Sequence, residues 1–333
     1  MLYLSFRREV TAKFYTSTLQ RPALGTATLN YTGTSHSFFI LLGIPGVEDQ
    51  HGWISLPFFI SYLVGLLGNC LLIFVITIDH SLHEPMHLFL CMLAWLTSSC
   101  LLLLCHILVS SCLLPLVTFW FHAGAISLDG WVTQIFFIHT TFILESGILL
   151  AVAFDCYVAI CDPLHYSTVL NCAVIIRIGV AVVLRSFCVI LPDVFLVKQL
   201  PFCHSNLLPH TYCEHMAVAK VACADILVSV WYGLSVLLPA VVLDALPILV
   251  SYSLILYAVF HLSSRGAQQK ALGTCGSHLG VISMFYLPGI FTIITQRFGH
   301  HVPLHTHILL ANVCMFAPPM LNPIIYGIKT RQI

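Results

Sequence analysis

The residues of this chain that could do chemistry include ionisable groups inside long apolar stretches, namely Glu145, Arg185 and Asp244. Ionised side chains at membrane depth are rare, and they commonly mark an ion path, a proton relay or a ligand site. One interpretation is therefore a seven-helix transporter or proton path. Transporters usually contain internal repeats and broken helices at matching positions. The sequence shows no such repeat, so this interpretation ranks last.

A histidine-rich segment offers a second chemistry, because imidazole binds Zn, Cu or Ni. The four residues His300, His301, His305 and His307 are loosely spaced and have no acidic residue at a fixed interval. We interpret them as part of a hydrated loop and expect no metal site. The chain also lacks a glycine-rich phosphate loop and a nucleophile elbow. We therefore expect no cofactor and no enzyme activity.

Composition indicates that the elements positioning these residues lie in lipid. The chain has 333 residues, of which 59% are hydrophobic and 8% charged, and its mean hydropathy is +0.96. These values exclude an ordinary soluble two-domain protein. Thirteen Lys and Arg balance 13 Asp and Glu, so no basic surface for nucleic acid is expected. Most of the 14 cysteines lie in apolar runs, which is typical of small core residues.

The stretches between charges predict seven membrane-spanning helices, because one span needs about 20 mostly apolar residues. The expected fold class is an all-α, seven-transmembrane helix bundle with spans at 54–78, 86–112, 130–157, 173–195, 226–262, 271–296 and 303–327. The prediction also includes an extracellular N-terminal segment 1–53, a second extracellular loop 196–225 and a cytoplasmic tail 328–333.

The orientation of the bundle follows from two weaker signals. With the N-terminus outside, the cytoplasmic ends of the helices carry five Lys or Arg and the outer ends carry three, if the four basic residues of the leader are left out. This difference favours an extracellular N-terminus and a cytoplasmic C-terminus, although the leader raises the outer count to seven. A glycosylation sequon begins at Asn30 and favours the same orientation.

Three local motifs then point to one receptor family. Residues 153–164 are A-F-D-C-Y-V-A-I-C-D-P-L, residues 270–278 are K-A-L-G-T-C-G-S-H, and residues 318–326 are P-P-M-L-N-P-I-I-Y. In order and spacing they resemble the signatures of olfactory receptors, which are rhodopsin-like G-protein-coupled receptors. G-I-P-G at 43–46 and H-E-P at 83–85 resemble the class I, or fish-like, branch.

The resemblance implies an odorant receptor that binds a small volatile ligand and activates a stimulatory olfactory G protein, which raises cyclic AMP. The implied protein is multi-pass, lies in the plasma membrane of olfactory sensory neuron cilia, and has the ligand, a heterotrimeric G protein and membrane lipid as partners. The implied switch residues are Asp155, Cys156, Tyr157, Asn322, Pro323 and Tyr326. Pro323 removes a backbone donor within a helix, so polar groups nearby can pair in more than one way.

Two departures from the family pattern bear on function. Cys156 stands in the place of the motif Arg, and a thiol cannot present a guanidinium fork to a G protein. Trp131 stands in the place of the Cys that ties the third helix to the second outer loop. The resemblance pairs Cys203 with Cys223 and leaves Cys213 without its usual partner. A decayed receptor that no longer signals is therefore the alternative function.

A third departure lies in the second helix, where Thr97 is the polar residue nearest to the position of the family's Asp. Glu145 consequently lacks the carboxylate that the family places opposite it. We expect Glu145 to be protonated or bonded to a hydroxyl, since an isolated carboxylate in lipid is costly. Residues 1–29 and 95–118 fit the family poorly, through either true divergence or an altered reading frame.

The resemblance places the ligand among the outer halves of the third, fifth, sixth and seventh helices. Tyr286 resembles the toggle position of the sixth helix, and Arg297 lies 11 residues further, about three turns along. We expect Arg297 to pair with the carboxylate of an acid ligand, while His139 and Phe142 line the pocket floor. The alternative is that Arg297 is an interfacial cation whose side chain reaches toward the lipid head groups.

Overall fold

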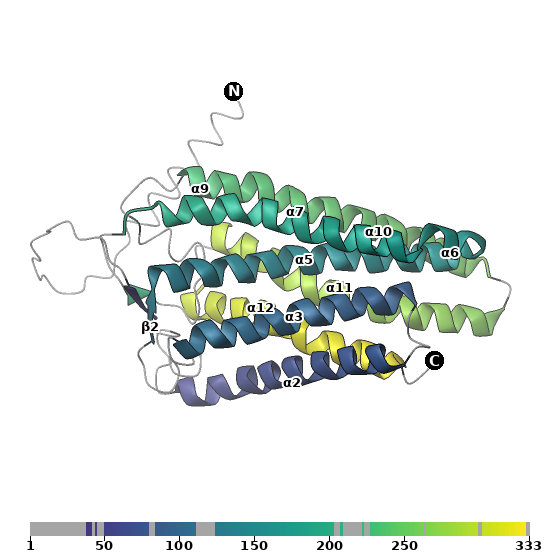
Figure 1. The fold of residues 1–333 in the computed structure, drawn as a ribbon, viewed down its shortest axis with the longest axis horizontal. Helices are drawn as coiled ribbons and strands as arrows, with labels where there is room; N and C mark the ends of the chain where they lie inside the picture. The colour runs from purple at the N-terminus through teal and green to yellow at the C-terminus, as the bar shows by residue number, and fades with distance from the viewer. Residues whose placement is uncertain are drawn as a thin grey trace, which may run out of the picture.

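The computed structural model describes residues 38–41, 44, 50–79, 84–110, 124–202, 207–208, 222, 227–262, 264–298 and 302–330. In this part of the chain, long helices lie side by side along one direction (Figure 1). The long helices are α2 (His51–Ile78), α3 (Pro85–Ser110), α5 (Leu128–Cys161), α7 (Cys172–Lys198), α10 (Leu238–Phe260), α11 (Arg265–Phe298) and α12 (Leu304–Thr330).

Short elements extend or join these helices. The helix α9 (Leu227–Tyr232) and the π-helical turn η4 (Gly233–Leu237) lead directly into α10. The 3₁₀ turn η3 (Pro163–His165) and the single turn α6 (Tyr166–Val169) join α5 to α7. The strands β1 (Phe38–Leu41), β2 (Gly124–Ser127) and β3 (Leu207–Leu208) form a small sheet at one end of the bundle. We call this end the outer end and the opposite one the inner end.

Six segments of the described chain are long and apolar enough to cross a membrane, namely Gly52–Ile78, Pro85–Leu102, Leu128–Cys161, Cys172–Lys198, Gly233–Phe260 and Leu304–Ile325. The remaining long helix, α11, has 34 residues. At about 1.5 Å per residue this length exceeds the roughly 30 Å of a bilayer core. The predicted all-α, seven-helix membrane bundle is therefore confirmed. The expected end of the second span at residue 112 lies outside the described residues.

The ends of the central helix α5 follow from local chemistry. The Ser127 side chain accepts a hydrogen bond from the Gly130 backbone N–H at 3.1 Å, which caps the first turn. At the inner end, Asp162 follows the last helical residue and Pro163 begins a 3₁₀ turn. The residue before a proline is disfavoured in the helical region, so the chain turns there. These two signals fix the length over which α5 can present side chains to its neighbours.

The core of the bundle lies around α5, which packs against α3, α7 and α10. Its buried side chains lie between Trp131 and Val158, and the turn at 136–139 is the one that contributes none. Figure 1 shows α5 running between α3 and α7. By contrast, much of α2 and α10 is exposed and apolar, as expected for surfaces that face lipid. Polar side chains on the buried faces of α5 are therefore the ones positioned to join several helices.

The outer end of α5 is covered by the small sheet. Strand β1 pairs antiparallel with β2 and parallel with β3, so it lies in the middle. Fully buried Trp131 packs against Phe39 of β1 and Phe202, with ring centroids 5.3 and 5.5 Å apart. Trp131 thus forms a buried aromatic cluster with Phe39 and Phe202 at the position where the family pattern has a cysteine.

Candidate ligand-coupling site

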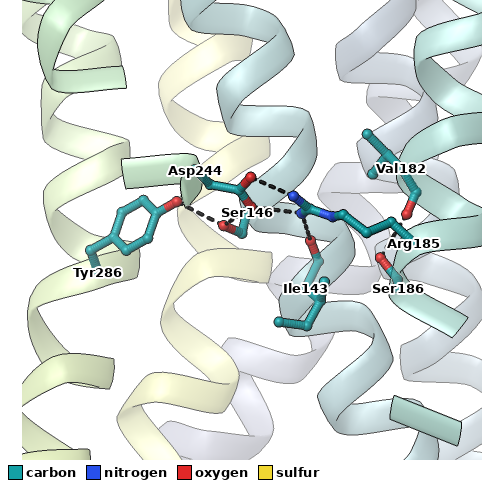
Figure 2. Close-up of polar contacts among 7 residues, drawn as sticks. All are labelled: Ile143, Ser146, Val182, Arg185, Ser186, Asp244 and Tyr286. Carbon is teal, nitrogen blue, oxygen red and sulfur yellow. Dashed lines mark hydrogen bonds and ion pairs between the residues drawn. The ribbon is translucent and has the colours of Figure 1, made fainter. Parts of the chain in front are cut away.

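A polar network crosses the middle of the bundle and joins four helices (Figure 2). Its centre is Asp244 on α10, whose side chain is 2% exposed. Arg185 on α7 holds both carboxylate oxygens, with Nη1 at 2.5 Å from Oδ1 and Nη2 at 2.7 Å from Oδ2. This bidentate geometry is the strongest form of a guanidinium–carboxylate pair. The two charges that the sequence places at membrane depth therefore neutralise each other.

The network continues from Asp244 toward α11 through hydroxyl groups. Ser146 on α5 donates to Asp244 Oδ2 at 2.7 Å, and its Oγ lies 2.7 Å from the Tyr286 hydroxyl. Because the single Ser146 proton is used toward the carboxylate, the Tyr286 hydroxyl donates to Ser146. A continuous chain of hydrogen bonds thus connects Tyr286, Ser146, Asp244 and Arg185, and a movement of the Tyr286 hydroxyl removes a partner of the serine that donates to the buried carboxylate.

Neighbouring residues of α5 make room for the guanidinium group. A Cβ atom added at Gly147 would lie 3.2 Å from Arg185 Nη2 and 2.7 Å from a methyl group of Val182. Glycine at this position lets α7 approach closely, as small residues do between membrane helices. Arg185 Nη2 also lies 3.5 Å from the Ile143 carbonyl oxygen. One turn of α5, from Ile143 to Gly147, therefore receives the Arg185 side chain.

Aromatic rings lie on the outer side of this network. Phe142, one turn before Ser146 on α5, stacks on Phe285 with ring centroids 4.6 Å apart and an interplanar angle of 22°. Phe285 in turn contacts Tyr286 edge to face at 5.0 Å. Two of the expected ligand residues, Phe142 and Tyr286, are thus connected through one ring. A ligand that displaces Phe142 would press on the ring next to Tyr286.

The other two expected ligand residues are less closely tied to the network. His139 lies on α5 three residues before Phe142, is half-buried, and places Nδ1 2.9 Å from the Ile135 carbonyl oxygen of its own helix. Arg297 belongs to the last turn of α11, and its side chain lies outside the described residues. Its contact with a ligand carboxylate therefore stays a prediction.

A cavity of about 640 Å³ lies elsewhere, between the outer ends of α2 and α12. It is lined by Gln50, Trp53, Ile54, Pro57, Phe58 and Leu309. None of the four expected ligand residues lines it. Trp53 is 80% exposed, so this cavity opens toward the surroundings of the bundle rather than toward its centre.

At the inner end of α5, Asp155 is buried and accepts a hydrogen bond from the Tyr166 hydroxyl at 2.9 Å. Tyr166 belongs to the turn α6 between α5 and α7. Burial, and then the negative charge of Asp155, raise the pKa of the Tyr166 hydroxyl above its usual value. Tyr166 therefore remains a proton donor at physiological pH and holds the carboxylate that the family's motif Arg would otherwise engage.

The remaining switch residues lie in the same inner half. Cys156 is buried, and Tyr157 is half-buried against the main core. On α12, Asn322 and Pro323 are buried, whereas the side chain of Tyr326 lies outside the described residues.

Helix α2 approaches α12 closely at Pro323. A Cβ atom at Gly68 would lie 2.8 Å from the Pro323 ring, so only glycine fits without a shift. The adjacent Asn69 donates to the Gly65 and Pro319 carbonyl oxygens at 2.7 and 2.9 Å. Pro319 lies one turn before Pro323 on α12. This part of α12 is therefore fixed to α2 by packing and by hydrogen bonding.

Comparison with known proteins now identifies the family. A family model described as olfactory receptor matches residues 58–333. Human olfactory receptor 52B4 is 59% identical over 308 residues, which cover 92% of this chain and 95% of that receptor. Human olfactory receptors 52B2 and 52D1 are 53% and 52% identical, and they cover 91% and 89% of this chain and 92% and 91% of their own lengths.

The chain belongs to the olfactory receptor family. It is a multi-pass protein of the plasma membrane, an odorant receptor of the G-protein-coupled class, and not an enzyme. The resemblance of the three sequence motifs is confirmed. The pairing of Arg185 with Asp244 also gives these charges a role within a receptor, which removes the reason for a transporter or proton path.

Glu145, one residue before Ser146, bonds to a hydroxyl, which is one of the two states that the sequence predicts. It is buried, and Thr97 of α3 donates to its Oε1 at 3.4 Å. The hydroxyl substitutes for part of the hydration that the carboxyl group loses. The expectation that Glu145 bonds to a hydroxyl is therefore confirmed, and α3 joins α5 at this level of the receptor.

The predicted covalent features of the receptor lie outside the described residues. These are the Cys203–Cys223 disulfide, Cys213 and the glycosylation site at Asn30. The residues just before the two paired cysteines, Phe202 and Ala222, form an isolated antiparallel bridge. The Cys203–Cys223 pairing itself stays a prediction.

Sequence reasoning missed the site as a connected unit. Arg185 and Asp244 were noticed as separate charges, and Ser146 was not singled out. The signal that could have joined them is charge balance, because two opposite charges at similar depth in lipid rarely remain apart. The hydroxyl of Ser146 carries no such signal, since serine is common in membrane helices.

Proposed function

We propose that this receptor binds a small volatile carboxylic acid and activates a stimulatory olfactory G protein, raising cyclic AMP in the cilia of olfactory sensory neurons. The observation that supports this most is the hydrogen-bond chain from Tyr286 to Arg185, which adjoins the stacked rings of Phe142 and Phe285 through the contact of Phe285 with Tyr286. The chain is a structure that a ligand at the outer side can bias.

The proposed mechanism begins at the aromatic stack. A ligand that contacts Phe142 or Phe285 favours one position of the Tyr286 ring over another. When the Tyr286 hydroxyl leaves Ser146, the Ser146–Asp244–Arg185 cluster must find a new arrangement, because buried polar groups are costly without partners. The ligand thus shifts an equilibrium between two packings by its differential affinity for them. This shift involves the four helices that carry the network, namely α5, α7, α10 and α11.

The acid preference rests on Arg297 at the outer end of α11. A ligand carboxylate paired with a guanidinium group at this site gains charge-assisted hydrogen bonds that an alcohol of equal length cannot make. His139 and Phe142 would line the pocket further inside. The alternative position for Arg297, with its side chain directed to the lipid head groups, predicts no preference for acids.

The test is a cyclic AMP assay in cells that express the receptor, with staining of the surface population in the same cells. The ligands are short carboxylic acids, each matched by the alcohol of the same carbon number. We expect acids to elicit a response and Arg297→Ala to lose it by about 10- to 100-fold in potency, the value of one charge-assisted pair, at unchanged surface staining. Arg297→Lys is the matched control and retains part of the response. An unchanged dose response in Arg297→Ala would reject the contact.

A second candidate function is a receptor that reaches the membrane but does not signal. It is favoured by Cys156, which replaces the guanidinium group of the family motif. The variant Cys156→Arg separates the two candidates. A response in the variant and none in the unmodified receptor supports the second candidate, whereas a response in both supports the first.

A further inference from the structure

A second polar cluster lies at the inner end of the receptor, around the residue that departs most from the family motif. The Cys156 thiol of α5 is buried and lies 3.2 Å from Nδ1 of His278 on α11. The same nitrogen lies 3.1 Å from the hydroxyl of Tyr252 on α10. His278 and Tyr252 are 1% and 3% exposed. Three helices therefore meet at one imidazole nitrogen.

The chemistry of the three groups is complementary without any formal charge. In the neutral imidazole tautomer with a bare Nδ1, the single lone pair of this nitrogen accepts a hydrogen bond that the Tyr252 hydroxyl and the Cys156 thiol share as donors. A guanidinium group in the place of Cys156 would have only donors to offer, and it would bring a charge that must be desolvated. The thiol is therefore suited to close this cluster in a way that the family's Arg is not.

Helix α11 connects this inner cluster to the ligand-coupling site. Tyr286 and His278 lie eight residues apart on α11, which corresponds to about 12 Å along the helix. Tyr286 contacts Ser146 of α5, and His278 contacts Cys156 of the same helix. Helix α11 is thus held to α5 at two levels, one near the ligand and one near the cytoplasmic end.

The neighbouring Asp155 has a partner of its own, so it does not compete with His278 for the Cys156 thiol. The carboxylate of Asp155, next to Cys156, is already bonded to Tyr166. Cys275, one turn before His278, and Tyr252 are buried in the same core. The thiol is 5% exposed, so the cluster excludes solvent as long as α11 remains against α5.

We propose that Cys156, His278 and Tyr252 form an uncharged latch that holds the inner ends of α5, α10 and α11 together, and that opening of this latch exposes the Cys156 thiol to the cytoplasm. The use of the latch in signalling rests on the proposed receptor function. Its existence does not, because it follows from contacts among the receptor's own side chains.

The test is the rate at which N-ethylmaleimide modifies Cys156 in membranes that contain the full-length receptor. The thiol sulfur adds to one carbon of the maleimide double bond, and the thiol proton ends on the other carbon. Fragment masses distinguish Cys156 from Cys161, which lies in the same helix and is half-exposed. Cys161 therefore serves as an internal reference for access of the reagent.

In the unmodified receptor, we expect Cys156 to react more slowly than Cys161. Tyr252→Phe removes one hydroxyl, keeps the ring and should raise the Cys156 rate by about fivefold, the population change that one hydrogen bond represents. Ser277→Ala is the matched control, because the Ser277 hydroxyl bonds only to the Gly273 carbonyl oxygen of its own helix among the bonds described. Equal rates in Tyr252→Phe and the unmodified receptor, or a Cys156 as reactive as Cys161, would overturn the latch.

Variants at Cys156 provide a second test through buried Cys275 on α11. Cys156→Ser keeps a donor to His278 and should leave Cys275 protected, whereas Cys156→Val removes the donor and should raise the reaction rate of Cys275. Equal protection of Cys275 in both variants would contradict the latch. A protected Cys156 in a receptor that gives no cyclic AMP response would count against the proposed function and not against the latch.

Discussion

Asp244 is the side chain on which the ligand-coupling site depends most. It is almost fully buried, and its carboxylate receives three hydrogen bonds, two from Arg185 and one from Ser146. A buried ion pair contributes little net stability compared with two apolar residues of similar size, but loss of one partner leaves an uncompensated charge. The pair therefore specifies how α7 and α10 are arranged more than it stabilises them.

This asymmetry predicts the behaviour of three variants. Asp244→Leu and Arg185→Leu should each destabilise the receptor, with Asp244→Leu costing about 3–5 kcal/mol because Arg185 then keeps an unpaired charge. The double variant should recover most of this loss, and it should lose ligand coupling. Thermal unfolding of the detergent-solubilised receptor measures the effect. A double variant less stable than either single variant would show that the pair stabilises the fold in its own right.

At the residue scale, the sequence predicted a contact where the chemistry of one residue determines the kind of partner that it needs. A carboxyl group in lipid needs a hydrogen-bond donor, so a hydroxyl partner for Glu145 was predictable, although Thr97 was noted only as the polar residue nearest to the position of the family's Asp. The pairing of Arg185 with Asp244 was not predicted, because it depends on how two helices are rotated about their axes. Local sequence patterns do not fix that rotation in helices whose faces are all apolar.

At the scale of elements, aromatic packing connects the outer end of α5 to its surroundings where the family pattern has a cysteine. We call this packing of Trp131 the aromatic tether. Trp131 removes the cysteine that the family pattern has there, yet the indole ring packs between β1 and the segment after α7 through Phe39 and Phe202. Phe39 and Phe202 also contact each other edge to face at 5.2 Å. Aromatic packing thus holds the sheet against α5, and the departure at Trp131 is consistent with a folded receptor.

Trp131→Ala tests this tether. Truncation of a fully buried tryptophan costs about 3–5 kcal/mol, so we expect a large loss of receptor at the cell surface. Trp53→Ala is the matched control, because Trp53 is 80% exposed. Surface staining by flow cytometry with an N-terminal epitope compares the two. The tether is refuted if both variants reach the surface as well as the unmodified receptor.

The element scale also shows where sequence patterns were sufficient. Long apolar stretches predicted the helices, whereas the turn after α5 was not predicted, although it follows from the local backbone restriction before Pro163. The aromatic cluster was not predicted, because Phe39, Trp131 and Phe202 come from three distant segments. Only the tertiary arrangement of the sheet brings these rings together.

At the scale of the whole molecule, two polar clusters on α11 divide the receptor into an outer, ligand-facing half and an inner half. Tyr286 belongs to the first cluster and His278 to the second, and both contact α5. The rest of the core between them is mostly apolar and close-packed. Packed interiors tend to switch between discrete arrangements rather than deform continuously. We therefore expect a change at Tyr286 to reach the inner end as a movement of α11.

In the proposed mechanism, the Tyr286 hydroxyl couples ligand binding to the buried charge pair through Ser146. The measurement that tests it most directly is the cyclic AMP dose response of the receptor and its Tyr286→Phe variant to short carboxylic acids, at matched surface staining. We expect a response from the unmodified receptor and a strongly reduced maximal response from Tyr286→Phe, since the ring is kept and only the bond to Ser146 is lost. Identical dose responses from the two proteins would contradict it.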